Sequence, residues 1–192
     1  MSIKGENMNI EFPMFQTARL VLRAFQLSDA KEVQRMAGHP SVAATTSTIP
    51  HPYLDGVAED WISKHVDWYK NGSSVDFAIE LQSSQKLIGN ISLIFDKKNH
   101  KAEIGYWVGV EFWNQGYCSE AMKAVIDYAF EVRGLNKITC RHMATNPASG
   151  KVMIKNGMAQ EGVLKHDLYK DGRFVDIVVY GLLRIEWEFK DF

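Results

Sequence analysis

The sequence predicts a single α/β domain, and three observations support this prediction. First, the chain has 192 residues, the size of one domain that can bury a substantial core. Second, 46% of the residues are hydrophobic and 23% are charged, as in an ordinary globular protein. Third, alternating strand patterns take turns with helical stripes along the chain, without an internal repeat or a linker. We therefore expect a lead-in over residues 1–15 and one domain over residues 16–192.

Charge and cysteine content argue against several classes of function. The net charge is −1 and the pI is about 6.6, so no global positive field draws the chain to nucleic acid or to an anionic membrane. The two cysteines, Cys118 and Cys140, have neither metal-ligand spacing nor a disulfide pattern, which suits a reducing compartment. No apolar stretch is long enough for a signal peptide or a membrane span. We expect a cytoplasmic protein that binds no metal, because the histidines are scattered as well.

The first half of the chain predicts three strands and two helices around a long irregular stretch. The strands alternate apolar and polar residues, and the helices carry apolar residues three or four positions apart. The irregular stretch contains three prolines, and a loop of this length inside a compact domain often borders a binding cleft. In chain order we expect a strand over 19–25, a helix capped by Ser28 or Asp29, the loop over 40–53, a helix over 54–70, and strands over 75–81 and 87–95.

The central segment reads as a strand, a tight turn and a helix. Over residues 102–110 the alternation places Glu103, Gly105 and Gly109 on one face, and glycines inside a strand mark a close approach of a ligand or backbone. After the turn over residues 113–118, apolar residues recur at helical spacing. The first N–H groups of a helix lack acceptors, and the helix dipole favours an anion there. The turn is therefore either a phosphate site or a plain strand–helix connection.

The last third of the chain predicts one more strand, one helix and a hairpin. Asn followed by Pro is a strong helix start, because Asn caps the helix and Pro suits its first position. The hairpin turn contains Asp-Gly, which two-residue hairpin loops favour. We expect a strand over 137–144, a helix from Asn146 to Asn156, and hairpin strands over 162–169 and 174–187 around Lys170, Asp171 and Gly172.

Five segments occur in an order and at a spacing that resemble one family. They are RLVLR at 19–23, PHPY at 50–53, EIGYW at 103–107, QGYCSEA at 115–121 and ATNPAS at 144–149. On these segments the chain resembles the GNAT family of acyl-CoA-dependent N-acetyltransferases. Within that family it is most similar to the RimJ/RimL-like branch, which acetylates the N-termini of ribosomal proteins. The resemblance runs from Arg19 to Arg184.

The resemblance implies a fold and a reaction. The fold is an α/β (α+β) domain with a central mixed, mostly antiparallel twisted sheet of about seven strands, splayed between the fourth and the fifth and flanked by about four helices. The reaction transfers an acetyl group from acetyl-CoA to a primary amine by direct attack in a ternary complex. The partners that the resemblance implies are acetyl-CoA and an amine acceptor such as the α-amine of a ribosomal protein N-terminus.

The resemblance also implies a cofactor site. Backbone amides of the turn would hold the pyrophosphate, and the end of the central strand would pair with pantetheine and polarise the thioester carbonyl. Two positions depart from the branch pattern, because Asn114 stands where it mostly has Gly and Cys118 where it has Ala. We still expect the cofactor to fit, with an affinity that could be lower. The expected residues are Val108, Gly109, Val110, Gln115, Gly116, Tyr117, Cys118, Ser119, Asn146 and Ser149.

Proton transfer needs a base for the amine and a donor to the leaving thiolate. An α-amine has a pKa of roughly 7.7–8.0, so it demands a weaker base than lysine does. Glu103 is the first candidate, acting directly or through water, and it is alternatively a structural carboxylate paired within the sheet. His166 and Asp167 are rivals for the base. Ser149 is either the donor to the thiolate or an ordinary residue of a first helical turn.

The sequence is also compatible with other roles for Cys118, other acceptors and other classes of function. Cys118 at a helix start is either a small packing residue or a reactive thiol. An acceptor of a different kind, such as an antibiotic, a polyamine or an amino acid, suits the same fold, because the fold does not determine the substrate. A non-catalytic acyl-CoA-binding module and an interaction protein using the aromatic-rich loop are further alternatives. The chain is a monomer or a homodimer, and no direct nucleic-acid partner is expected.

Overall fold

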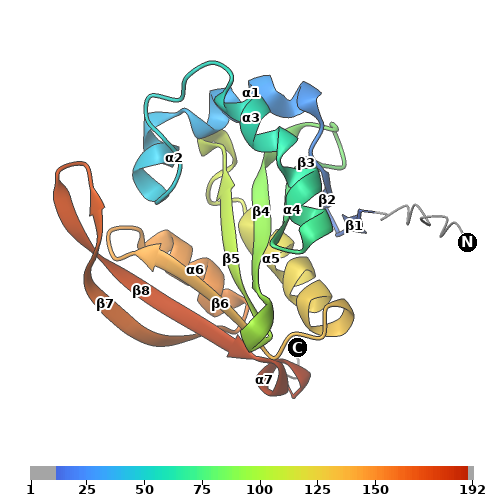
Figure 1. The fold of residues 1–192 in the computed structure, drawn as a ribbon, viewed down its shortest axis with the longest axis vertical. Helices are drawn as coiled ribbons and strands as arrows, with labels where there is room; N and C mark the ends of the chain where they lie inside the picture. Colours follow the sequence, from blue (N-terminus) through green and yellow to red (C-terminus); the bar gives the residue numbers. More distant parts are fainter. Residues whose placement is uncertain (1–11, 190–192) are drawn as a thin grey trace, which may run out of the picture.

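An open sheet of eight strands forms the centre of the protein (Figure 1). The computed structural model describes residues 12–189. The strand order is β1-β2-β3-β4-β5-β6-β8-β7, and every neighbouring pair is antiparallel except β5 and β6. The sheet is therefore mixed and mostly antiparallel, as expected. The strands are β1 Phe15–Gln16, β2 Leu20–Ala24, β3 Ser74–Leu81, β4 Leu87–Asp96, β5 Lys101–Val108, β6 Lys137–Met143, β7 Ala159–Lys170 and β8 Arg173–Leu183.

Helices cover both faces of this sheet. In Figure 1, α3 and α4 lie in front of the sheet and α5 and α6 lie behind it. One face of β3 to β5 packs its apolar side chains against α5, and Phe77, Ile91 and Met122 are fully buried there. The helices are α1 Ala30–Ala37, α2 Pro40–Thr45, α3 Val57–Ser63, α4 His65–Asn71, α5 Tyr117–Asp127, α6 Pro147–Lys155 and α7 Arg184–Glu188.

The predicted splay lies between β5 and β6. The two strands pair only over their first four residues, from Lys101 opposite Lys137 to Ile104 opposite Cys140. Beyond Ile104 they diverge, and Figure 1 shows the widening gap. These are the fourth and fifth strands of the predicted order, so the expectation is confirmed. The gap leaves backbone groups of β5 without a strand partner on this side.

Helix α5 follows the strand–turn–helix pattern of the sequence. Its buried side carries Ala121, Met122, Val125 and Ile126, spaced three and four residues apart. The helix continues as one π-helical turn over Tyr128–Val132, and Gly134 follows at a φ of 62°. A left-handed glycine directly after a helix is a common stop signal, as the sequence predicted.

Several predicted boundaries differ from the structure. The stretch over 40–53 contains helix α2, because Pro40 stands at a first helical position and the His39 side chain accepts from the Ser41 N–H. The helix over 54–70 is divided into α3 and α4. Strand β5 ends at Val108, and Val110–Phe112 form a 3₁₀ turn. These divisions, with α2 and α7, give seven α-helices within residues 12–189 in place of about four.

The two chain ends also differ from expectation. Residues 1–11 of the predicted lead-in lie outside the described residues. Phe15 already begins β1, which pairs with β2 and adds an eighth strand to the predicted seven. The predicted last strand ends early, at Leu183, and α7 follows. Trp187 of α7 packs on Phe130, with ring centroids 5.4 Å apart, which turns the chain back onto the core.

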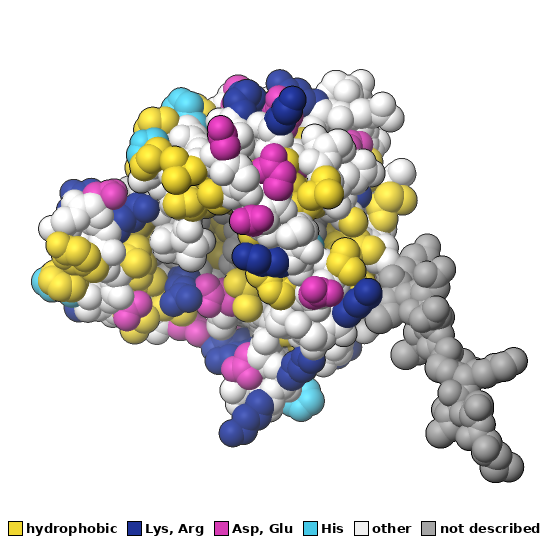
Figure 2. All heavy atoms as spheres, turned by 45° about the horizontal axis from the view of Figure 1, so that its top comes forward, with side chains coloured by type: hydrophobic (Ala, Val, Ile, Leu, Met, Phe, Trp, Pro, Cys, Tyr) yellow, Lys and Arg dark blue, Asp and Glu magenta, His cyan; other side chains and the backbone are white. Residues whose placement is uncertain are grey.

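The hairpin of β7 and β8 projects as an arm. Its turn contains Asp171 and Gly172 at φ values of 49° and 77°, the left-handed pair that a tight hairpin loop requires. Tyr169 and Phe174 are exposed near its tip. Figure 2 shows hydrophobic side chains gathered on a lobe beside the main body, with a recess between them. The arm forms one side of the cleft described next.

Candidate active site

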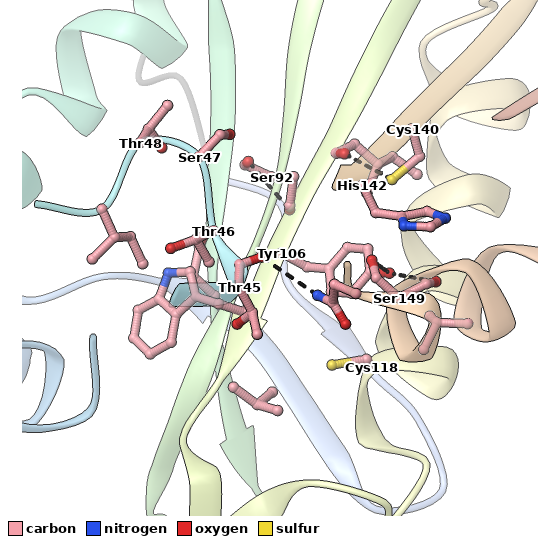
Figure 3. Close-up of a pocket in the computed structure, with 18 of the residues that line it drawn as sticks. Thr45, Thr46, Ser47, Thr48, Ser92, Tyr106, Cys118, Cys140, His142 and Ser149 are labelled. Atoms are coloured by element: carbon pink, nitrogen blue, oxygen red, sulfur yellow. Dashed lines mark hydrogen bonds between the residues drawn. The ribbon is translucent and has the colours of Figure 1, made fainter. Parts of the chain in front are cut away.

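A cleft of about 1230 Å³ lies where β5 and β6 part. Its floor is the diverging pair of strands, and its sides come from the end of α2, the start of α5 and the start of α6. Figure 3 shows Thr45 and Thr46 across the opening from Ser149, with Tyr106 between them. The predicted loop over 40–53 therefore borders the cleft, as expected.

The turn before α5 presents free backbone donors to the cleft. Asn114 and Gly116 have φ values of 59° and 81°, and these left-handed residues turn the chain sharply into the helix. The first intrahelical bond is donated by the Glu120 N–H to the Gly116 carbonyl. The N–H groups of Tyr117, Cys118 and Ser119 therefore precede the helical ladder and have no acceptor within it. With the helix dipole they make an anion site.

Arg19 fastens this turn to the first long strand. Its Nη1 donates to the Gln115 carbonyl at 3.0 Å, and its Nε donates to Glu120 Oε2 at 2.7 Å. Its guanidinium lies 4.5 Å from the centre of the Tyr117 ring. Arg19 adds a positive charge beside the anion site, and sequence reasoning had assigned it only to a strand. Nothing in its local sequence indicated this long-range contact, which spans about 100 residues of chain.

The end of β5 offers fewer free groups than the sequence suggested. The Gly109 N–H donates to the Ile88 carbonyl at 2.9 Å, so it is not available to a ligand. Val110 lies in the 3₁₀ turn rather than in the strand. The Val108 carbonyl accepts from Trp113 Nε1 at 2.9 Å. Because N–H groups alternate in direction along a strand, the Val108 N–H points away from β4 and into the gap.

Tyr106 and Ser149 meet in the middle of the cleft. The Tyr106 hydroxyl lies 2.7 Å from Ser149 Oγ and also donates to the Ser149 carbonyl at 3.0 Å (Figure 3). Burial raises the pKa of Tyr106, so its hydroxyl stays protonated at neutral pH. The two hydroxyls form a chain that can pass a proton. Sequence reasoning found Ser149 but gave Tyr106 no role, because alternation put it on the face with Ile104 and Val108, opposite the glycines.

The cysteines of the cleft are held as thiols at neutral pH. Burial raises the pKa of Cys118 to about 12, so the group is a thiol rather than a thiolate at neutral pH. Cys140 donates to the Ile104 carbonyl at 3.1 Å, and burial raises its pKa too. The packing interpretation of Cys118 is the better one. The start of helix α5 would lower the pKa of Cys118, but the effect of burial is larger.

The candidate bases fall in different surroundings. Glu103 lies at the edge of the cleft, where its Oε1 accepts from Arg141 Nε at 2.8 Å across β5 and β6. His166 is exposed, and its ring stacks on Phe174 with centroids 5.8 Å apart. Asp167 lines the cleft from β7. The structure thus brings Glu103 and Asp167 to the cleft and leaves His166 on the arm. Their roles as bases stay predictions.

Asn146 begins α6 but does not cap it with its side chain. Its Nδ2 instead donates to the Thr45 carbonyl at 3.4 Å, at the end of α2. The predicted side-chain cap is therefore wrong, because tertiary contact with α2 takes the amide. The bond ties the two sides of the cleft together, and Asn146 lines the cleft as expected.

One buried acid in the cleft escaped the sequence analysis. Asp76 of β3 faces the cleft beside Ser92 of β4. A lone carboxylate between Val75 and Phe77 in a buried strand was a usable signal, because buried charges need a reason. Among the described residues, no group of three His, Cys, Asp or Glu side chains could hold a metal ion. Over the same residues, no helix is long and apolar enough to cross a membrane.

The splayed sheet and the donor-rich helix start form a site that suits an anionic ligand, and comparison with known proteins gives the family. A family model described as the acetyltransferase (GNAT) domain matches residues 19–159. The chain therefore belongs to the GNAT family of acyl-CoA-dependent N-acetyltransferases. YoaA of Bacillus subtilis (strain 168), named an uncharacterized N-acetyltransferase, is 29% identical over 183 residues, which cover 90% of this chain and 98% of YoaA.

Relatives with more specific names differ in their acceptors. The ribosomal-protein-serine acetyltransferase of Escherichia coli (strain K12) is 32% identical over 96 residues, covering 50% of this chain and 54% of the relative. The spermidine N(1)-acetyltransferase of Vibrio cholerae is 23% identical over 161 residues, which cover 83% of this chain and 90% of the relative. The solved structure of RimL, a ribosomal L7/L12 α-N-protein acetyltransferase with coenzyme A, has a TM-score of 0.81 at 20% identity, covering 89% of this chain and 98% of that one. That likeness establishes the fold alone.

Proposed function

We propose that the protein transfers an acetyl group from acetyl-CoA to the α-amino group of a protein N-terminus. The observation that carries the proposal is the position of the hydroxyl pair of Tyr106 and Ser149. It lies between the anion-binding start of α5 and the open edge of β5, where the two halves of the reaction would meet. The two free thiols suit a cytoplasmic enzyme.

The residues around the pair have separable roles. The N–H groups of Tyr117, Cys118 and Ser119 bind the diphosphate of the cosubstrate, and Arg19 stands beside them. The open edge of β5 pairs with the amide groups of pantetheine. The Val108 N–H points into the same gap and polarises the thioester carbonyl. None of these roles needs a metal or a covalent enzyme intermediate.

The chemistry is one displacement accompanied by proton transfers. The neutral amine attacks the thioester carbon, so a C–N bond forms and the C–S bond breaks. The new amide nitrogen gives up its extra proton to water in the cleft, the hydroxyls of Tyr106 and Ser149 donate a proton to the leaving sulfur, and the same water returns a proton to the hydroxyl pair. Because the pKa of Tyr106 is raised, it relays this proton with Ser149 rather than standing ionised.

The names of relatives support the choice of acceptor. Acetylation of a ribosomal protein is the activity in the name of the Escherichia coli relative. A cleft open on both sides of β5 also leaves room for an extended chain end. A small amine is the alternative, favoured by the spermidine acetyltransferase among the relatives.

Two measurements test the proposal in sequence. The first is a calorimetric titration with acetyl-CoA, beside ATP as a control for unspecific phosphate binding. We expect micromolar binding of acetyl-CoA and much weaker binding of ATP. The second measures thiol release with peptides that begin with serine or alanine, with the same peptides blocked at the N-terminus, and with spermidine. Acetyl-CoA binding without turnover of any amine would leave a non-catalytic binding module instead.

A further inference from the structure

A row of polar side chains crosses one face of the sheet inside the cleft. Asp76 of β3 stands opposite Ser92 of β4, and Ser92 stands opposite Gly105 of β5. Of the six buried polar or charged side chains among the described residues, four lie on this face: Ser74, Asp76, Asn90 and Ser92. All four line the cleft. Ser74 donates to Asp76, Asn90 Nδ2 donates to the Phe77 carbonyl at 3.2 Å, and Ser92 Oγ donates to the Gly105 carbonyl at 3.4 Å, so among these four Asp76 is the group whose charge is not compensated.

Asp76 stands out because no cation pairs with it. Its carboxylate is 8% exposed, and its Oδ2 accepts from Ser74 Oγ at 2.8 Å. Within residues 12–189 it has no ion pair with a lysine, arginine or histidine. Burial is accordingly the main influence on its pKa, which is raised to about 6. A carboxylate in this state destabilises the fold, and such groups concentrate at functional sites.

The other buried acid among residues 12–189 shows what a structural role looks like. Asp29 is 9% exposed, nearly as buried as Asp76. Both of its oxygens accept from the Arg23 guanidinium, at 2.8 and 3.0 Å, and one also accepts from the Gln26 N–H. The fold therefore satisfies a buried carboxylate where its role is structural. Asp76 is left with one neutral donor and an open cleft in front of it.

The other ionisable groups around this face are already engaged or neutral. Arg23 of β2 lies on the same face and is held by Asp29. His65 of α4 is neutral at pH 7, because burial lowers its pKa to about 4. Glu103 of β5 is paired with Arg141. None of these three groups neutralises Asp76, and the cleft-lining cations Arg141, Lys151 and Lys155 form no ion pair with it, so within residues 12–189 a cationic ligand would supply the missing charge.

The row ends at Gly105, at the edge of the gap through which the cleft reaches the hydroxyl pair on the other face of β5. Gly105 has no side chain, and the Ser92 hydroxyl reaches over it: Ser92 Oγ donates to the Gly105 carbonyl at 3.4 Å and would lie 3.2 Å from a Cβ at Gly105. Gly105 directly precedes Tyr106. Two strand spacings separate Asp76 from Gly105, about 10 Å between Cα atoms. The Asp76 side chain and an amine, with Ser92 or one water between them, span that distance.

We propose that Asp76 binds the ammonium group of the acceptor and takes its proton before the amine attacks. This inference rests on the proposed function and assigns the residue that handles the acceptor. One N–H bond of the ammonium breaks and one O–H bond forms on Asp76, giving a neutral amine and a neutral acid. The amine then reacts as described above, and Asp76 returns its proton to water through the cleft. Ser92 holds the amine or the connecting water in line.

This assignment makes a statement about the class of acceptor. An α-amine, with a pKa of roughly 7.7–8.0, gives its proton to an acid of pKa about 6 with an unfavourable ratio of about 100-fold. An alkyl amine such as that of lysine or a polyamine has a pKa near 10.4, so the transfer of its proton to the same acid is unfavourable by about 10⁴-fold. Asp76 therefore favours α-amines over alkyl amines. Selectivity for the N-terminus follows from the base as well as from the shape of the cleft.

The test compares Asp76→Asn with wild type in the full chain. We expect kcat/KM for a peptide with a free N-terminal serine to fall by 100-fold or more, while the Kd of acetyl-CoA changes less than twofold. In wild type, log kcat/KM should bend near pH 6, and the variant should lack this bend. Asp76→Glu should recover part of the rate. Asp67→Asn, which removes an exposed carboxylate of α4, is the matched control and should behave as wild type.

The outcomes separate this inference from the proposed function. Wild type that binds no acetyl-CoA, or acetylates no amine, refutes the proposed function, and the inference falls with it. Wild type that acetylates the peptide while Asp76→Asn stays within threefold of it refutes the inference alone. A loss in Asp76→Asn that is equal at all pH values and not recovered by Asp76→Glu also counts against it, because a merely structural role gives that pattern.

Discussion

The burial of Asp76 predicts that replacing it with asparagine stabilises the fold at neutral pH. Asparagine has nearly the same shape and can still accept a hydrogen bond from Ser74. Burial raises the pKa of Asp76 from 3.8 to about 6, and each pKa unit corresponds to about 1.4 kcal/mol, so ionised Asp76 lowers the free energy of unfolding by about 3 kcal/mol. Allowing for imperfect hydrogen bonding of the new amide, we expect a net gain of about 2 kcal/mol at pH 7.5.

The sign of the pH dependence follows from the direction of the shift. The folded-state pKa of Asp76 lies above its unfolded value, so the folded state binds the proton more tightly. The stability associated with neutral Asp76 is fully present below about pH 3.8 and is lost as the pH rises through about 6. The gain from Asp76→Asn should therefore be largest above pH 7 and should vanish near pH 4.

Urea unfolding of both proteins at several pH values between 4 and 8 measures this difference. At neutral pH the expected gain corresponds to about 4–8 °C in Tm for a chain of this size. Other carboxylates also titrate in this range, but they do so in both proteins, and the difference isolates Asp76. Asp29→Asn is a matched control that should destabilise the protein, because it breaks a buried pair with Arg23. A gain that is absent, or equal at pH 4 and pH 8, would refute the reasoning.

Three further predictions concern the cleft. Tyr106→Phe should lower kcat by about 100-fold with the Kd of acetyl-CoA unchanged, because it removes one hydroxyl of the proton relay. Stopped-flow measurement of thiol release tests this, and an unaltered kcat would contradict the relay. Gly116→Val should abolish acetyl-CoA binding in calorimetry, because a β-branched residue is strained at a φ of 81°. The control is Gly134→Val, which changes a glycine that is also left-handed but lies at the far end of the same helical segment, and it should bind acetyl-CoA normally. Glu103→Gln should keep kcat/KM within threefold if Glu103 only pairs with Arg141, and a loss confined to acidic pH would make Glu103 the base instead.

The elements that local pattern could predict are those whose pattern repeats over several turns or residues. Helix α5 was predicted because its apolar residues recur at helical spacing and a glycine lies at each end. The hairpin turn was predicted from Asp171 and Gly172, whose backbone preference is local. Helix α2 was missed because it is one and a half turns long and surrounded by turn residues. The division between α3 and α4 was missed because the apolar pattern continues across Lys64.

The site was predictable in part for the same reason. The turn from Gln115 to Ser119 owes its chemistry to backbone groups, and a glycine before a helix is visible in the sequence. Ser149 was reached through family resemblance. Arg19 was missed as a site residue because its partner Glu120 is distant in the chain. Asp76 was missed because its burial beside Ser74 without a cation depends on which elements surround it in the fold. Tyr106 was misjudged because alternation assumes a continuous sheet, and the sheet opens at that residue.

The sequence by itself determined the class of fold, the order of its main elements and the donor-rich start of α5, since all three depend on periodicity and on backbone preferences of neighbouring residues. Only the tertiary structure decided which side chains share the cleft. It brought Ser149 to Tyr106 and pairs Glu103 with Arg141 across the gap. It also placed Asp76 in the cleft without a cation, because the burial and pairing of a charge depend on which strands become neighbours.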